Sequence, residues 1–208
     1  MPDGPLLEID DISLRVEAGD LAILTRTPPS WDGIDGHEIR LQGDDITSWG
    51  HDIRLQAGLF VTTCDPSPVP GIRTVDLVHR LGVPGTAAQR QSLATDWCDK
   101  LELEPEVIGR DLDAGFTPAE GTSVELLHLA LLRPDVAVID VATATSPENR
   151  RAAIVRGVQQ IRTEQPDIAV VIVTNDDELI AGLTPDHVTT HASTDTRVGQ
   201  AHRDEKLL

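Results

Sequence analysis

Apolar and polar residues form short repeating patterns along the first third of the chain. Apolar side chains either occupy every second position or run continuously over a few residues, which predicts short buried or half-buried strands. These segments are Leu7–Ile9, Ile12–Val16, Leu21–Leu24 and Ile39–Leu41. Turn-forming residues separate them, for example at Ala18–Asp20 and Gly43–Asp45. We therefore expect a β-rich N-terminal part, with a further strand at 58–63 that leads into a proline-rich loop.

The periodicity becomes helical from Thr74 onward. Apolar residues recur at helical spacing in a short segment before Gly82 and in a longer one between Gly85 and Glu104. A third helix is expected through Val124–Leu131. The middle of the chain is thus predicted to be a helical region between two groups of strands.

Two continuous apolar runs, Val136–Asp140 and Ile168–Thr174, enclose a further helix. The start of that helix is predicted by Ser146 as N-cap, Pro147 at the first helical position and Glu148 near the positive end of the dipole. Fully apolar strands joined by a helix are typical of a parallel sheet that is covered on both faces. The predicted fold class is therefore α/β.

Length and charge narrow the class of protein. The 208 residues suit one domain, 1–208, with a helical insert at 65–122. There are 35 acidic residues against 17 basic ones, and the formal net charge of -18 makes nucleic acid an improbable partner. Because no apolar stretch reaches membrane-spanning length and no signal peptide is apparent, we expect a soluble, cytoplasmic protein without direct membrane insertion. A salt-adapted source and a genomic base-composition effect explain the acidic composition equally well. Cys64 and Cys98 are expected to be free thiols.

Four segments follow one another in an order and pattern that a known family shares. They are Leu7–Asp20, Ala57–Ile72, Leu126–Asp140, and Val173–Ile180 together with Thr184–Val188. In this order they resemble parts of the nucleotide-binding domain of ABC ATPases: the opening strands, the Q-loop region, the Walker B helix and strand, and the switch-histidine strand with the closing hairpin. The Pro-x-x-x-Pro-Gly spacing at Pro66–Gly71 makes the chain most similar to SufC, the ATPase of the SUF iron-sulfur cluster assembly system. The resemblance implies an ABC ATPase-like fold with a mixed sheet, and ATP with magnesium as the ligands of an intact member.

The phosphate loop of such a domain is not recognisable. Its Gly-x-x-x-x-Gly-Lys-Ser/Thr pattern lets backbone N–H groups cradle phosphates while the lysine neutralises their charge. The resemblance places it after Leu24, where the sequence reads Thr25–Gly33 without this pattern, and the next strand follows early. The only lysines are Lys100 and Lys206. We expect the loop and its helix to be deleted, and Arg26 to be a surface residue rather than an anion ligand.

Four other positions of the family's catalytic apparatus also differ. The resemblance places Cys64 at the Q-loop glutamine, Thr117–Glu120 at the signature motif and Asn175 at the switch histidine. Asp140 keeps the Walker B position, but Val141 stands where the general base is expected, and valine can neither orient nor deprotonate water. Cys64, Asp140 and Asn175 are therefore interpreted as vestigial, with a loop-capping role favoured for Asp140.

These departures favour a pseudo-ATPase with no catalytic residue, cofactor or metal. The resemblance implies docking through the Q-loop and insert region, onto SUF scaffold proteins or an active SufC-type ATPase. The residues expected to contact such a partner are Asp65, Pro68, Pro70, Gly71, Ile72 and Val75. The alternative is a residual ATP-binding or ATPase subunit of a SUF system or an ABC transporter, which would keep ATP and magnesium as cofactors. His187 and His191 lack a third ligand of clear spacing and do not predict a metal site.

Overall fold

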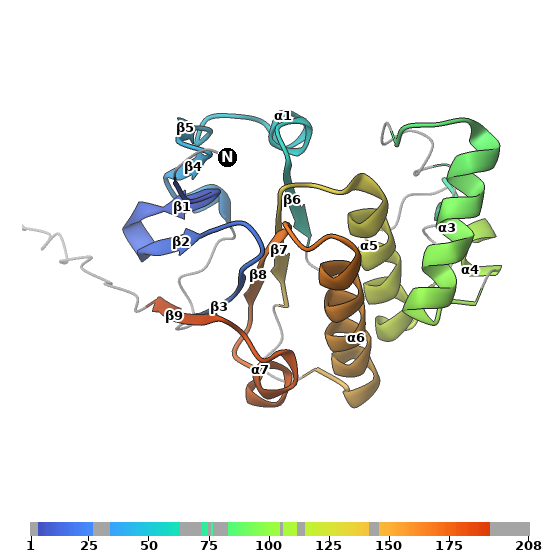
Figure 1. The fold of residues 1–208 in the computed structure, drawn as a ribbon. Helices are drawn as coiled ribbons and strands as arrows, with labels where there is room; N and C mark the ends of the chain where they lie inside the picture. The colour runs from blue at the N-terminus through green and yellow to red at the C-terminus, as the bar shows by residue number, and fades with distance from the viewer. Residues whose placement is uncertain are drawn as a thin grey trace, which may run out of the picture.

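The computed structural model describes residues 4–26, 34–62, 72–74, 76, 83–104, 106–111, 115–141 and 146–191. Within these residues the chain forms two sheets and a group of helices (Figure 1). The strands are β1 (Leu7–Ile9), β2 (Leu14–Val16), β3 (Leu21–Arg26), β4 (Ile39–Leu41), β5 (Asp44–Asp45), β6 (Leu59–Thr62), β7 (Val136–Asp140), β8 (Ala169–Val173) and β9 (His187–His191). The α-helices are α1 (His51–Gln56), α3 (Ala87–Leu101), α4 (Glu106–Gly109), α5 (Pro118–Leu132), α6 (Glu148–Glu164) and α7 (Asp177–Leu183).

The smaller sheet is antiparallel and has the strand order β2-β1-β4-β5. Leu7 lies opposite Val16 on one side and Leu41 on the other, so the alternating apolar residues of three strands share one face. Gln42 and Gly43 turn the chain from β4 into β5 with positive φ angles of 52° and 89°. The N-terminal strands predicted from alternation are confirmed.

The larger sheet is entirely parallel, with the order β6-β7-β8-β3-β9. One face packs on the helices, because Ile139 and Ile172 belong to the apolar cluster that also contains side chains of α3, α5, α6 and α7. The other face packs on the antiparallel sheet, because Val138 and Val171 belong to the cluster that contains the side chains of β1, β2 and β4. The sheet is therefore buried on both faces, and the molecule has three layers (Figure 1).

Side-chain caps define where the two long central helices begin. Thr86 and Gln89 form a capping box at the start of α3, and Thr117 and Glu120 form another at the start of α5, with Pro118 in its first turn. These helices agree with the segments predicted from helical periodicity. The short helix expected before Gly82 falls largely outside the described residues. The expected end of the insert, residue 122, lies within α5.

One local prediction is wrong, and one helix was not predicted. The helix α1 was not expected, since six residues are too few to show a helical period. Ser146 is not the N-cap of α6: Pro147 holds that position, because its backbone is still non-helical with ψ at 146°. The backbone N–H of Ser146 donates to Asp176, the N-cap of α7. Thr184–Val188 leads into β9, which lies parallel to β3 after the crossover through α7, and the second strand of the expected closing hairpin would lie outside the described residues.

No helix in the described ranges combines the length and the apolar character that a membrane crossing would need.

Candidate functional site

The carboxyl ends of β7, β8 and β3 lie side by side. Asp140 pairs with Val173, and Val173 pairs with Leu24. Ligands of open parallel sheets bind beyond this edge, where loops leave the strands. The structure thus brings the predicted positions Asp140 and Asn175 to adjacent strand ends, the first half-buried and the second exposed. This edge is the candidate nucleotide site.

Val141 follows Asp140 at this edge and is turned into the core. Its backbone N–H donates to the carbonyl of Val173 at 2.9 Å, which extends the pairing of β7 and β8 by one residue. Its side chain is 1% exposed and belongs to the apolar cluster on the helical face of the sheet. Val141 therefore contributes packing, and its side chain offers no group that could activate water.

Asp176, beside Asn175, has a carboxylate engaged by the surrounding backbone. Its Oδ1 accepts hydrogen bonds from the N–H groups of Glu178 and Leu179, both at 3.1 Å, which caps α7. Its Oδ2 accepts from the N–H of Ser146 at 2.9 Å and lies 3.7 Å from Nη1 of Arg151. Burial raises the pKa of this carboxyl, but the three N–H groups and Arg151 together lower it by more, so the pKa lies below its usual value.

Two arginines tie the start of α6 to neighbouring elements. Arg151 donates to the carbonyl of Ser146 and also forms an ion pair with Glu178 of α7. Arg150 is buried, and its Nε donates to Oγ1 of Thr122 in α5 at 3.1 Å. These contacts tie the start of α6 to α5 and α7. The contacts of Arg151 with Glu178 and of Arg150 with Thr122 were not found from the sequence, because these partners are distant along the chain. The Asp176 cap was not predicted either, although an aspartate before an acidic first turn is an N-cap signal.

The segment predicted to replace the signature motif lies at a helix start, as expected. Oγ1 of Thr117 accepts from the N–H of Glu120 at 3.2 Å, and Oε2 of Glu120 accepts from the N–H of Thr117 at 2.8 Å. Oε1 of Glu120 pairs with Arg110 at 2.8 Å. The hydrogen bond from Thr117 is the largest of several contacts that lower the pKa of Glu120. A carboxylate therefore already closes this helix terminus, which leaves it poorly suited to a second anion.

A polar cluster that no sequence pattern indicated lies where β6 ends. Oγ1 of Thr62 donates to Oε2 of Glu125 at 2.8 Å, and Oε1 of Glu125 lies 3.8 Å from Nδ1 of the buried His128. Ile72, one of the predicted docking residues, is half-buried against the helical side of the core. The other residues predicted to dock, and Cys64, which is predicted to be vestigial, lie outside the described part of the chain.

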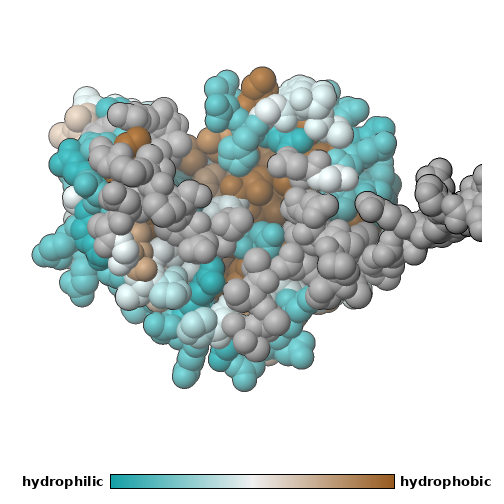
Figure 2. Space-filling view, turned by 180° about the vertical axis from the view of Figure 1, so that it is seen from behind, coloured by the Kyte–Doolittle hydropathy of each residue, from teal (hydrophilic) through white to brown (hydrophobic). Residues whose placement is uncertain are grey.

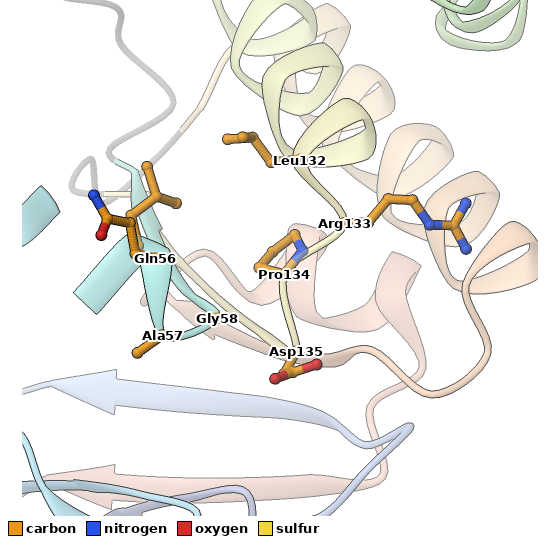
Figure 3. A pocket seen from close by; sticks show the side chains of 8 residues that line it. Gln56, Ala57, Gly58, Leu132, Arg133, Pro134 and Asp135 are labelled. Atoms are coloured by element: carbon orange, nitrogen blue, oxygen red, sulfur yellow. The ribbon is translucent and has the colours of Figure 1, made fainter. Parts of the chain in front are cut away.

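A hollow of about 220 Å³ opens at the opposite, amino-terminal edge of the sheet (Figure 3). Asp135 lines this hollow, and its carboxylate accepts a hydrogen bond from Nε2 of Gln42 at 3.0 Å. Gly58 allows this approach, because with φ at +101° a Cβ there would lie 2.6 Å from the same carboxylate. We assign this hollow a structural role. Among the described residues no three His, Cys, Asp or Glu side chains come together as a metal site.

An antiparallel sheet packed on a parallel sheet with helices on its far face is the ABC ATPase-type fold. Among solved structures, cbiO1 from Clostridium perfringens, part of the ABC transporter complex cbiONQ, matches with a TM-score of 0.66 over 90% of this chain and 85% of that chain, at 11% identity. An ATP-binding cassette in a post-hydrolysis state bound to ADP and Pi matches with a TM-score of 0.67 over 86% of this chain and 84% of that one, at 13% identity.

Sequence relatives are consistent with this fold. A Streptococcus pyogenes protein named "Probable ABC transporter ATP-binding protein" is 27% identical over 177 residues, which cover 82% of this chain and 67% of the relative. A Synechocystis protein named "Probable ATP-dependent transporter" is 25% identical over 164 residues, which cover 74% of this chain but only 63% of the relative. No family model matches. The chain is an ABC ATPase-like protein.

The described residues fit ATP with magnesium poorly. Asp140 is retained as one carboxylate at the carboxyl edge, but Val141 is packed into the core and Asn175 has no titratable group near neutral pH. No catalytic step can be derived from these side chains.

Proposed function

We propose that this protein is a non-hydrolysing, SufC-like ABC ATPase homologue that acts as a partner or regulatory subunit, linked to iron-sulfur cluster assembly. The burial of Val141 carries the proposal. At this position an active domain needs a carboxylate that faces the nucleotide, whereas here an apolar side chain packs among core residues at 1% exposure. The missing phosphate-loop pattern in Thr25–Gly33 supports the same reading. We place the protein in the cytoplasm.

Partner binding is proposed for the region around the end of β6 and the insert at 65–122. The apolar side chain of Ile53, on α1 immediately before β6, is 54% exposed. The rear of the molecule shows hydrophobic side chains gathered in a hollow on its upper part (Figure 2). Exposed apolar surface of this kind is typical of interaction sites. SUF scaffold proteins or an active SufC-type ATPase are the proposed partners, in contact with Asp65, Pro68, Pro70, Gly71, Ile72 and Val75.

The second candidate function is a residual ATP-binding subunit of a SUF system or an ABC transporter. The names of the relatives and the retained Asp140 favour it. Calorimetry with ATP and magnesium, together with thermal unfolding, separates the two functions. A ligand at 100 times its Kd would stabilise the fold by about 2.7 kcal/mol, which for a domain of this size raises Tm by roughly 5–11 °C.

We expect no binding up to millimolar ATP, and the same Tm with and without nucleotide in the wild type and in Asp140→Asn. Micromolar binding that Asp140→Asn abolishes would establish the residual ATP-binding function instead. If binding is absent, co-purification with each SUF component tests the partner role. Ile53→Ser tests the proposed surface and should weaken capture. Leu93→Ser is the matched control, because it alters an exposed leucine on α3 and should leave capture unchanged.

A further inference from the structure

A second hollow, of about 290 Å³, lies between the turn after α3, the first turns of α5, and α6. Its inner wall is apolar, because Leu103, Val107 and Ala153 line it and are themselves almost fully buried. The volume is near the lower end of the range of about 300–1,000 Å³ found for small-molecule pockets. The space suits a ligand of side-chain size better than a nucleotide.

Ser123 provides a polar group inside this hollow. The residue is 5% exposed and lines the wall of the hollow. Because Ser123 lines the hollow, its hydroxyl is available to a ligand there. The oxygen has two lone pairs, so it can accept a hydrogen bond from a donor on the ligand.

The charges around the hollow favour a cation. Glu102, Glu104 and Glu120 line it, against Arg156 as the single basic residue in the lining. Arg156 is paired with Glu102 at 3.1 Å, and Glu120 is paired with Arg110 from outside the lining at 2.8 Å. Glu104 is exposed and forms no ion pair among the described residues. The formal charge of -18 on the whole chain further disfavours an anion here.

We propose that this hollow binds a primary alkylammonium group, with its methylene chain against Leu103, Val107 and Ala153 and its ammonium between Glu104 and Ser123. Long aliphatic stems with a charged head commonly bind in this way, with the stem on apolar surface and the head among polar groups. The proposal is independent of whether the protein binds ATP.

The source of the ammonium is a lysine residue of a bound protein. The buried Nε of Arg156, which also lines the hollow, lacks an acceptor among the described residues. The backbone carbonyl of a lysine residue could accept from this N–H, whereas a free diamine has no acceptor to offer. A lysine residue therefore satisfies Arg156 as well as Glu104 and Ser123.

The test is a calorimetric and NMR titration of the full chain with Nα-acetyl-lysine methylamide and, separately, with 1,5-diaminopentane. We expect saturable binding that weakens with added salt, with the lysine derivative the tighter ligand. Glu104→Gln and Ser123→Ala should each weaken it about tenfold. Glu106→Gln removes the same charge from an exposed position on α4 outside the lining and should leave the affinity within about twofold.

Three results would overturn the proposal. One is the absence of saturable binding, and another is equal binding of the uncharged isostere 1-pentanol. The third is an equal loss of affinity in Glu104→Gln and Glu106→Gln, which would mean non-specific attraction to an acidic surface. Tighter binding of the diamine than of the lysine derivative would overturn the lysine source. Unchanged melting of each variant checks that the fold is intact.

Discussion

Replacing Asp176 by alanine should destabilise the fold without any involvement of nucleotide. The carboxylate is 4% exposed and accepts hydrogen bonds from the N–H groups of Ser146, Glu178 and Leu179. Loss of an N-cap side chain costs about 0.5–2 kcal/mol. The Ser146 N–H would also lose its acceptor in a buried setting, at about 1–3 kcal/mol. We therefore expect the free energy of unfolding to fall by about 2–4 kcal/mol, or roughly 4–16 °C in Tm.

Urea unfolding at pH 7, followed by circular dichroism, measures this loss, and two variants act as controls. Asp177→Ala removes the same charge from an exposed position one residue further into α7 and should cost at most about 1 kcal/mol, which is the helix-dipole contribution. Asp176→Asn keeps one acceptor and should fall between the alanine variant and the wild type. A loss below about 0.5 kcal/mol in Asp176→Ala would refute the cap and indicate that Asp176 is kept for another reason.

The pH dependence gives an independent check on Asp176. Its pKa in the folded protein is lowered below the ordinary value of 3.8. A group of this kind stabilises the fold above its unfolded pKa, and the stabilisation is lost as the pH falls through the folded pKa. The difference in stability between wild type and Asp176→Asn should therefore be constant near neutral pH and shrink below about pH 3.8. A difference that instead changed between pH 6 and 8 would contradict the assignment.

Three further predictions concern the core. Gly157→Ala should destabilise the protein by about 1–3 kcal/mol in urea titrations, because the new Cβ would lie 2.6 Å from a methyl group of buried Leu126 and this overpacking outweighs the better helix propensity of alanine. The control Gly109→Ala should be nearly neutral, because a Cβ at that position has no neighbour within 4 Å. The pKa of Glu125 is raised by burial and lowered more strongly by its neighbours, so Glu125→Gln should flatten the loss of stability measured below about pH 4.5. Burial raises the pKa of the Cys98 thiol to about 11, so in a variant whose other cysteine is serine, iodoacetamide at pH 8 should react at least about 100-fold more slowly before unfolding than after.

The regular elements were predictable where one face of the element is consistently apolar. The pattern of Leu7–Ile9 specified a strand, and the buried residues of Val124–Leu131 specified a helix, because burial of one face dictates the period of the sequence. The parallel strand β9 was not predicted as such, because Thr189 and Thr190 are polar and its pairing with β3 joins residues 165 positions apart. Pairing of this kind depends on the whole fold and leaves no local pattern.

The candidate site was predictable in its positions but not in its contacts. Asp140 and Asn175 follow recognisable apolar strands, so their arrival at one edge of the sheet follows from parallel pairing. The contact of Asp176 with Ser146 could not be anticipated, because it joins residues 30 positions apart. Ser146 and Pro147 form a plausible cap in sequence, and only the position of α7 shows that Ser146 is used elsewhere.

The burial of Val141 bears on the proposal that this protein does not hydrolyse ATP. A buried valine contributes about 1.5–3 kcal/mol through its apolar surface, whereas a glutamate at the same depth would place a charge among Ile139 and the other side chains of the helical-face cluster. The side chain thus supports the layer that holds the parallel sheet against α5 and α6. Restoring a carboxylate at this one position would cost stability before it could serve catalysis, because Val141 would first have to leave the core. A scaffold role, which depends only on the fold, is compatible with this packing.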